Sequence, residues 1–483
     1  MMRSLFSGVS GLKAHQTRMD VIGNNIANVN TTGFKSSRTT FADTLSQTLT
    51  GASAPQDNVG GTNPKQIGLG TGVASIDLLF TDGSVQSTGK NTDLCLSGNG
   101  LFVVKQGSET YYTRDGAFAF DSEGNYVLPS SGLYVQGWMA EKGVLNTTGA
   151  ADNITIPAGK GMESEATAKV TYSNNLNAST LLIDSLTGGV DSKSTPTRKV
   201  ATASNPITLT MSDGTTQTVT SGSYIAGHSI PVTTTATIYD SLGTKHSIPL
   251  LFELTSKSTT TGSTWTISPA VTATTTTSGG TTTTEYDTKI KEDDGSTTTV
   301  ALTGGTVSFD TKGAYVAGTT ATTIALTYEA TKSGAAAPQT ATLDLTSLTQ
   351  YAGSSTINST SDGHAAGTLS SVSVDASGKI TGTYTNGVRQ TEAQVAVAQF
   401  TNASGLTKTG NSLYQESNNS GTANVKTASD LGVTITPSAL EMSNVDIANE
   451  FSDMIITQRG FQSNSKIITV GDEMLETLIN MKR

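Results

Sequence analysis

Large apolar residues recur every seven positions at both ends of this 483-residue chain. A seven-residue apolar repeat gives a helix one narrow apolar seam, which a lone helix cannot bury. Both ends are therefore predicted to be helices that need a partner. The predicted contact residues are Leu5, Val9, Leu12, Met19, Ile22 and Ile26 at the N-terminal end, and Ile447, Phe451, Met454, Phe461, Ile468 and Leu475 at the C-terminal end.

The periodicity alone leaves two interpretations open. Each helix is either an ordinary amphipathic helix lying on a globular core, or one member of a helix pair or of a packed array of molecules. Everything between the helices has the short alternating runs and Gly/Thr-rich turns of β structure. The position of the helices therefore favours pairing. The expected fold is multi-domain α+β, with the terminal helices paired in a coiled-coil-like layer and the remainder in mostly antiparallel β domains.

The first helix is expected over residues 4 to about 29, followed by an Asn-rich turn. Asn24, Asn25 and Asn28 are unusual in a helix, because asparagine competes for backbone hydrogen bonds. A fraying helix end or a packed polar contact explains them equally well. Thr31 and Gly33 follow, and Gly33 is well placed for the left-handed conformation that closes a helix.

Composition bounds the class of protein. Charged residues make up 14% and aromatic residues 6%, while glycine occurs 50 times, a profile of short strands and turns. The net charge is −10, and no basic patch is apparent, so a nucleic-acid partner is not expected. The acidity is interpreted as a contribution to solubility.

The single cysteine and the distribution of apolar residues exclude further classes. Cys95 lies in an alternating run and is expected in a buried strand, where no intrachain disulfide can form. No apolar stretch approaches the length of a membrane span, so membrane insertion is not expected. The N-terminus has no continuous apolar region of the secretory type, so export would not use a cleaved signal peptide.

Composition also suggests how the chain is divided. Residues 1–33 and 441–483 are predicted to form a terminal helical domain, and residues 34–72 an extended connector rich in Gly, Ser and Thr. Residues 73–164 and 363–440 read as two halves of one inner β-rich domain. Residues 165–362 read as an inserted outer β domain with one or two subdomains. The simplest interpretation of this domain is a soluble β sandwich with long polar loops.

A search for catalytic or cofactor motifs finds none of the common patterns. The four histidines lie in different predicted elements without metal-ligand spacing, and a surface or interface role is favoured over a catalytic one for His15. The run Asp121–Asn125 lacks the late glutamate of a calcium loop and is interpreted as a hairpin turn. Arg114 and Asp115 are likewise interpreted as turn residues. No enzyme activity, cofactor or metal is expected.

Both ends carry specific motifs. The run from Ser4 to Leu12, with Asn24-Asn25-Ile26-Ala27-Asn28 and Thr31-Thr32-Gly33-Phe34-Lys35, resembles the N-terminal signature of bacterial flagellar rod and hook proteins. The closing run resembles their C-terminal signature, through Glu441, Met442, Ser443, Asn444, Gln458 and Arg459. Internal runs such as Ile238–Gly243 and Gly410–Tyr414, and the long insertion, resemble the hook members of the family more than the shorter distal rod protein.

The resemblance implies a structural subunit of the flagellar hook, outside the cell. It implies self-assembly into a curved, flexible tube that joins rod to filament and transmits torque as a universal joint. The implied partners are other copies of the chain, the hook cap, the distal rod and hook–filament junction proteins, and the flagellar type III export apparatus. Paired helices of roughly 40 and 55 Å would line the tube's channel, and their ends would stay disordered in a free monomer.

Three alternatives stay open from sequence. A rod or other axial component would make a straight tube. A secreted adhesin or β-domain binding module would be a stable monomer with ordered ends. An enzyme would need an acid–base pair in the outer domain, and no motif nominates one.

Overall fold

The computed structural model describes residues 2–55, 60–192, 198–270, 272–278, 281–287, 289–291, 297–317, 322–327 and 339–481. Met1, Lys482 and Arg483, at the edges of the predicted helical domain, lie outside this range. The chain divides into two compact units, one of residues 1–160 with 369–483 and one of residues 161–368. The four-part division expected from composition is a finer statement and stays a prediction.

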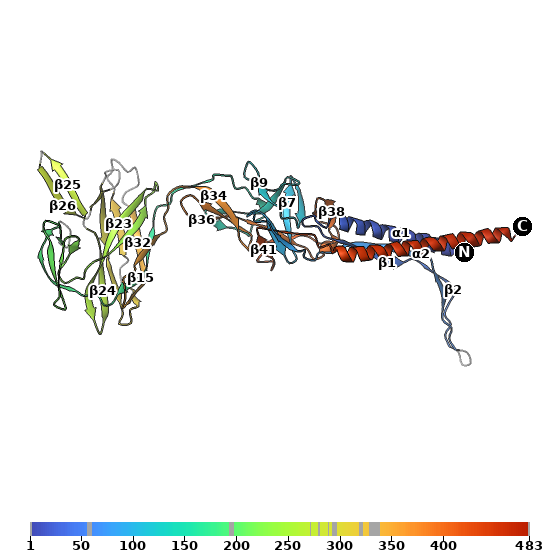
Figure 1. Ribbon diagram of the computed structural model, residues 1–483, viewed down its shortest axis with the longest axis horizontal. Coiled ribbons are helices and arrows are strands. Elements are labelled where there is room, and N and C mark those ends of the chain that lie inside the picture. Colours follow the sequence, from blue (N-terminus) through green and yellow to red (C-terminus); the bar gives the residue numbers. More distant parts are fainter. Residues whose placement is uncertain are drawn as a thin grey trace. The chain divides into compact units, whose positions relative to one another are not determined.

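The two terminal helices lie side by side in the first unit (Figure 1). Helix α1 spans Met2–Ala27 and helix α2 spans Ile447–Asn480. They are antiparallel, because Leu5 packs against Gly471 whereas Arg18 pairs with Asp453. Asp446 caps α2 by accepting hydrogen bonds from the first-turn amides of Ala448 and Asn449. The predicted fold class, paired terminal helices with mainly antiparallel β structure, is confirmed.

Two β ribbons follow α1. Strands β1 (Ser37–Asp43) and β4 (Thr71–Leu78) pair with each other. Strand β2 (Ser46–Thr50) pairs with β3 (Lys65–Gly68), and the residues of these two strands are all exposed. The β1–β4 ribbon contacts α1, where the Phe41 ring packs edge-on against His15 at 5.9 Å. His15 therefore lies where α1 meets this ribbon, and its predicted surface or interface role stays a prediction.

The β part of the first unit has a main sheet that combines strands from both halves of the chain. Its order is β34–β35–β36–β11–β7–β8–β39–β38, with β9, β10, β12, β13, β37 and β40 paired at its sides. The bounds are β7 Leu101–Gln106, β8 Glu109–Thr113, β9 Ala119–Phe120, β10 Tyr126–Leu128, β11 Leu133–Glu141, β12 Val144–Leu145, β13 Asp152–Asn153, β34 Gly367–Val374, β35 Lys379–Tyr384, β36 Arg389–Val395, β37 Val397–Gln399, β38 Thr407–Gly410, β39 Leu413–Gln415 and β40 Asn424–Lys426. A 3₁₀ turn spans Ala403–Gly405.

Two short strand pairs join this sheet to the helices. Strand β5 (Val85–Ser87) pairs with β42 (Ala439–Glu441), and β6 (Leu94–Ser97) pairs with β41 (Thr434–Pro437). Cys95 is buried in β6, as predicted. Each pair links a segment near the start of the chain to one just before α2.

The second unit is a β sandwich with a small added module. A sheet ordered β27–β28–β31–β32–β15–β33 and a sheet ordered β22–β23–β24–β29–β30 share one apolar core around Tyr172, Phe252 and Trp265. The only parallel pairing among the described strands joins β15 and β32. The bounds are β15 Lys169–Asn177, β22 Val232–Tyr239, β23 Lys245–Ser258, β24 Gly262–Pro269, β27 Lys289–Lys291, β28 Thr297–Thr303, β29 Thr306–Phe309, β30 Tyr315–Val316, β31 Thr322–Thr327, β32 Gln339–Tyr351 and β33 Asn358–Ser361.

The added module has its own core of Ile183, Ile207, Leu209, Met211 and Tyr224. Its two sheets are ordered β16–β19–β20 and β17–β18–β21. The bounds are β16 Ile183–Gly188, β17 Val190–Asp191, β18 Lys199–Val200, β19 Ile207–Met211, β20 Thr216–Val219 and β21 Ser223–Tyr224; the unit also contains β14 (Gly161–Met162) and the hairpin of β25 (Thr272–Ser278) and β26 (Thr281–Asp287).

One turn chemistry recurs in four hairpins across both units. In each, an aspartate side chain accepts hydrogen bonds from the backbone amides two and four positions later, and a glycine with positive φ stands three positions later. The turns start at Asp121, Asp240, Asp310 and Asp375 and use Gly124, Gly243, Gly313 and Gly378. The interpretation of Asp121–Asn125 as a hairpin turn is confirmed.

A buried ion pair fastens the added module to the sandwich. Arg198, beside β18, donates to both carboxylate oxygens of Glu253 on β23, at 2.7 and 2.5 Å. His228 lies 3.0 Å from the same carboxylate, and Arg198 also donates to Ser268. Burial on its own raises the pKa of Glu253, but the hydrogen bonds and charges of His228 and Arg198 outweigh burial and hold that pKa below its usual range.

We predict that Glu253→Gln lowers the free energy of unfolding of the second unit by about 3–5 kcal/mol at neutral pH, because it leaves the Arg198 charge buried without its partner. Lys199→Gln is the control: it removes the neighbouring exposed ion pair with Asp191, which contributes about 1 kcal/mol or less. The chain has two tryptophans, so a Trp138→Phe background leaves Trp265 as the only one. Its fluorescence during urea unfolding then reports on the second unit alone.

The same measurement has a defined pH dependence. A carboxyl whose pKa is lowered by folding contributes stability above its unfolded pKa of about 4.3 and loses it as the pH falls through the folded value. The gap between the wild-type chain and Glu253→Gln should therefore be full at neutral pH and shrink in acid, below about pH 4. A gap that is constant with pH would contradict the assignment.

Candidate functional site: the helix pair and the buried junction at its base

Small and polar residues are buried within the contact between α1 and α2, beside apolar side chains such as Leu5 and Ile468. Gly8 and Gly11 of α1 and Gly471 of α2 are buried. A Cβ atom at Gly11 would lie 2.6 Å from the Asn464 side chain, and one at Gly471 would lie 2.8 Å from Leu5. Thr457 is fully buried in the same row. Without a Cβ at these glycines the two backbones approach closely, as small residues permit wherever helices cross.

The structure divides the predicted contact residues. Ile22 is buried, and Leu5, Leu12, Met19, Ile26, Met454, Ile468 and Leu475 are half-buried. Val9, Ile447, Phe451 and Phe461 are 41%, 45%, 49% and 38% exposed. The helix pair therefore uses part of the predicted set, and the exposed remainder faces away from its own chain.

Further large apolar side chains of α2 are also exposed. Ile455, Ile456 and Met474 are 59%, 61% and 52% exposed, and Ile467, Leu478 and Ile479 are comparable. Exposed apolar side chains that gather along one element mark an interaction surface rather than ordinary surface composition. Helix α2 thus presents to solvent what a helix in a folded core would bury.

At the base of the helices lies a buried cluster of charges. Glu441, the last residue of β42, accepts a hydrogen bond from the Lys35 ammonium at 2.7 Å and from the Arg114 guanidinium at 3.1 Å. All three side chains are 1% exposed or less. Gly83 also donates its backbone amide to Glu441. Asp82, half-exposed, lies 3.5 Å from Arg114.

Other donors of this cluster reach backbone carbonyls, whereas the buried Nε of Arg114 has no hydrogen-bond partner among the described residues. Lys35 donates to Thr81, and Arg114 donates to Leu96 and Gly98. Burial lowers the pKa of Lys35, and the nearby Glu441 carboxylate opposes that shift. One carboxylate thus ties together the exit from α1, the loop after β8 and the strand that leads into α2. The interpretation of Arg114 as a turn residue is wrong for its side chain.

The signature residues lie around this junction. The Gly33 amide donates to the Glu441 carbonyl at 2.8 Å, and Gly33 has φ +63°, as predicted. A Cβ there would lie 2.4 Å from the backbone nitrogen of Asp115, so only glycine fits without strain. Asn444 accepts from the Ser36 amide and donates to the Leu79 carbonyl and the Thr81 hydroxyl. The segment that follows α1 and the segment that precedes α2 therefore meet in one network of hydrogen bonds.

Asn25 is the polar contact within the helix layer. Its side chain is 1% exposed, donates to the Ser37 carbonyl and the Glu450 carboxylate, and accepts from the Ser37 amide. It ties the end of α1 to both β1 and the start of α2. Of the two explanations for the Asn cluster, packed polar contact holds for Asn25. At the exposed helix end, the Asn28 side chain donates to the Asn24 backbone carbonyl.

The other signature residues have simpler positions. Met442 donates its amide to Ser84, and the Ser443 hydroxyl accepts from the Val445 amide. Thr31 donates to the Asn28 side chain. Gln458 and Arg459 are exposed on α2, where Arg459 donates to Gln462.

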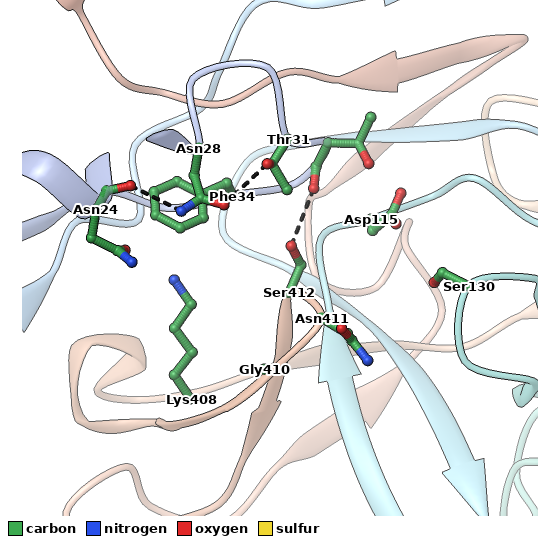
Figure 2. Close-up of a pocket in the computed structure, with 11 residues that line it drawn as sticks. Asn24, Asn28, Thr31, Phe34, Asp115, Ser130, Lys408, Gly410, Asn411 and Ser412 are labelled. Atoms are coloured by element: carbon green, nitrogen blue, oxygen red, sulfur yellow. Dashed lines mark hydrogen bonds between the residues drawn. The ribbon is translucent and has the colours of Figure 1, made fainter. Parts of the chain in front are cut away.

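A groove of about 670 Å³ lies between the end of α1 and the β38–β39 hairpin (Figure 2). Lys408 extends along it, with its ammonium 3.8 Å from the centre of the Phe34 ring. The Ser412 hydroxyl donates to the Thr32 carbonyl across the floor. Burial lowers the pKa of Lys408. These contacts give the junction a second link between the helix end and the β sheet.

Within the described residues, no group of three or more histidine, cysteine, aspartate or glutamate side chains is arranged to hold a metal ion. No described helix is both long and apolar enough to cross a membrane.

Comparison with known proteins identifies the family. Four family models match: "Flagella basal body rod protein" over residues 5–35, "Flagellar hook protein FlgE/F/G D1 domain" over 95–180, "Flagellar basal body protein FlaE D2 domain" over 228–364 and "Flagellar basal body rod FlgEFG protein C-terminal" over 436–481. The flagellar hook protein FlgE of Treponema pallidum is 38% identical to this chain over the full length of both. The chain belongs to the flagellar hook protein family.

Other relatives agree with this assignment. The hook protein of Borreliella burgdorferi is 36% identical over the full length of both chains, whereas a basal-body rod protein of Bacillus subtilis is 27% identical over the same extent. The protein is a structural, non-enzymatic subunit of the flagellar hook, outside the cell, and a hook subunit polymerises with copies of itself. The resemblance found in the sequence is confirmed. The four family models leave residues 36–94, 181–227 and 365–435 unmatched, and residues 181–227 contain most of the added module.

We predict that Glu441→Gln destabilises the first unit by about 3–5 kcal/mol, because two buried cations lose their counter-charge. Asp82→Asn is the matched control within the same cluster, where half-exposure limits the loss to about 1 kcal/mol or less. Chemical unfolding followed by Trp138 fluorescence, in a Trp265→Phe background, measures both. Equal losses would show that the cluster does not depend on Glu441.

Proposed function

We propose that this hook subunit polymerises through its terminal helices into a curved, flexible tube that joins rod to filament and transmits torque as a universal joint. The observation that supports this most strongly is the exposed apolar surface of α2. Burial of apolar surface stabilises by about 25 cal/mol per Å², so neighbouring copies that cover this surface would hold a helical layer together. The predicted contact residues that the helix pair leaves exposed would serve that purpose.

The buried junction would transmit load from the helices to the β sheet. Breaking a buried pair such as Lys35–Glu441 by losing one partner costs about 3–5 kcal/mol, so the base of the helices would move with the sheet rather than hinge against it. Bending would then require sliding between molecules. Contacts rich in Thr, Ser and water slide at lower cost than close-packed apolar ones, and the exposed strand faces of the second unit are rich in threonine.

We further propose partners and a route. At its ends the polymer would meet the distal rod, the hook cap during growth and the hook–filament junction proteins. The chain would travel through the flagellar type III export apparatus without cleavage of a signal peptide. This route is consistent with a single buried cysteine, because no disulfide has to form after export.

Electron microscopy of purified chains tests the proposal. The full chain, at high concentration and seeded with polymer fragments, should form curved tubes, whereas a chain that ends after Asp446 should keep its β fold and stay monomeric. The retained Glu441 and Asn444 keep the junction intact in this variant. Straight tubes would indicate a rod-like component, and tubes from the truncated chain would contradict polymerisation through α2.

A further inference from the structure

Most of the exposed apolar residues of α2 fall into two separate stripes, and Phe461 and Ile479 lie on neither. The first, Ile447, Phe451 and Ile455, repeats every four residues in the first three turns, and residues at this spacing share one face of a helix. Further along, the same face is polar and then acidic, with Gln458, Gln462, Glu473 and Glu476. The first stripe is therefore confined to the start of the helix.

The second stripe lies in the other half of α2. Ile467, Val470, Met474 and Leu478 follow one another at intervals of three or four residues, which again defines one face. Towards the start of the helix this face continues through Ser463 and Gly460 to a single apolar residue, Ile456. Each stripe thus occupies a different half of the helix.

The stripes also lie on different flanks. At 3.6 residues per turn, Phe451 and Ile467 point about 160° apart around the helix. The row of residues that contacts α1, which includes Thr457 and Gly471, faces a third direction. Phe451 and Val470 are separated by about 28 Å along the axis, at 1.5 Å per residue.

The second stripe borders a pocket. A hollow of about 460 Å³ lies between the N-terminal end of α1 and the second half of α2. It is lined by the small residues Ser4, Ser463 and Gly471, by Lys466, and by the apolar side chains of Ile467, Val470 and Met474. It is a mainly apolar hollow that is open to solvent, and three residues of the second stripe form one of its walls.

We propose that the first stripe of one copy seats on the second stripe of the next copy, with Phe451 entering this pocket. The inference rests on the proposed function, in which terminal helices assemble. The occupant is a second copy because the chain itself supplies the complementary shapes: an exposed aromatic residue with aliphatic neighbours on one flank, and a hole with aliphatic walls on the other.

The contact joins unlike surfaces, so it is head-to-tail and leaves one free stripe at each end of any oligomer. Such an interface generates rings or open helical arrays rather than closed two-fold dimers. Copies with parallel α2 helices would be staggered by about 28 Å along the helix axis. This stagger makes each helix bridge two levels of the array.

The size of the contact also favours an array. Three residues seated on four bury a few hundred Å² per partner, on the order of half the roughly 800 Å² per partner of a stable pair. A single contact is therefore weak. A copy that makes the contact on both flanks is held twice, so the arrangement favours polymer over dimer.

Cysteine cross-linking tests the register. Ile455 and Met474 have the same separation as Phe451 and Val470, so Ile455→Cys combined with Met474→Cys should give a ladder of covalent oligomers when pelleted polymer is treated with a short bis-maleimide. Each single variant should stay monomeric on a denaturing gel, and the two mixed should give dimers. The native Cys95 is a silent background, because it is buried and burial raises its pKa to about 11.

The outcomes separate the two proposals. Pelleted polymer without a ladder in the double variant, or dimers from Ile455→Cys alone, would overturn the staggered head-to-tail contact and leave polymerisation standing. A wild-type chain that forms no polymer under seeded conditions would overturn both.

A second measurement addresses Phe451 itself. Phe451→Ala should raise the critical concentration for polymerisation by about 30-fold, the effect of losing an interface residue of hot-spot strength. Gln462→Ala, on the same face but beyond the first stripe, should leave it unchanged. Equal effects of the two variants would contradict the seating of Phe451 in the pocket.

Discussion

The structure depends on one buried carboxylate. Glu441 is reached by segments from across the chain: Lys35 after α1, Arg114 after β8 and the Gly83 amide before β5. A carboxylate with this little solvent is stable only because cations and amides surround it. Since β42 leads directly into α2 and Lys35 follows α1, the same atoms fix where both helices leave the β sheet.

The helix pair built on that junction leaves much of its apolar surface exposed to solvent. Glycines and Thr457 line the inner contact, so the helices approach closely and much of the apolar side-chain surface points outward. In a protein that is most stable as a monomer, the large apolar side chains would lie in the inner contact and not on the outside. A subunit that is stabilised by neighbouring copies requires such an exposed apolar surface. The exposed surface of α2 and membership of the hook family therefore support the same proposal.

Local patterns were enough to predict much of the fold. Both helices, the strands around Cys95, the Gly33 turn and the Asp121 hairpin follow from periodicity and turn chemistry, which act over a few residues. The Arg114–Glu441 contact joins residues 327 positions apart, and no local pattern identifies it. The heptad rule found the apolar residues of α2, but Ile447 and Phe461 of that heptad are exposed, whereas the small residues Thr457 and Gly471 are buried at the inner contact. The alternation of Ile207, Leu209 and Met211 was a visible strand signal within the added module.

The central claim is that polymerisation covers the outer faces of α2. Hydrogen exchange measured on the soluble chain and on seeded polymer tests it most directly, because backbone amides of an exposed helix open locally far more often than those of a packed one. The account predicts that protection over residues 447–480 rises at least about tenfold on polymerisation, while the core strands around Phe102 and Trp265 change little. Equal protection of α2 in the two states would contradict it.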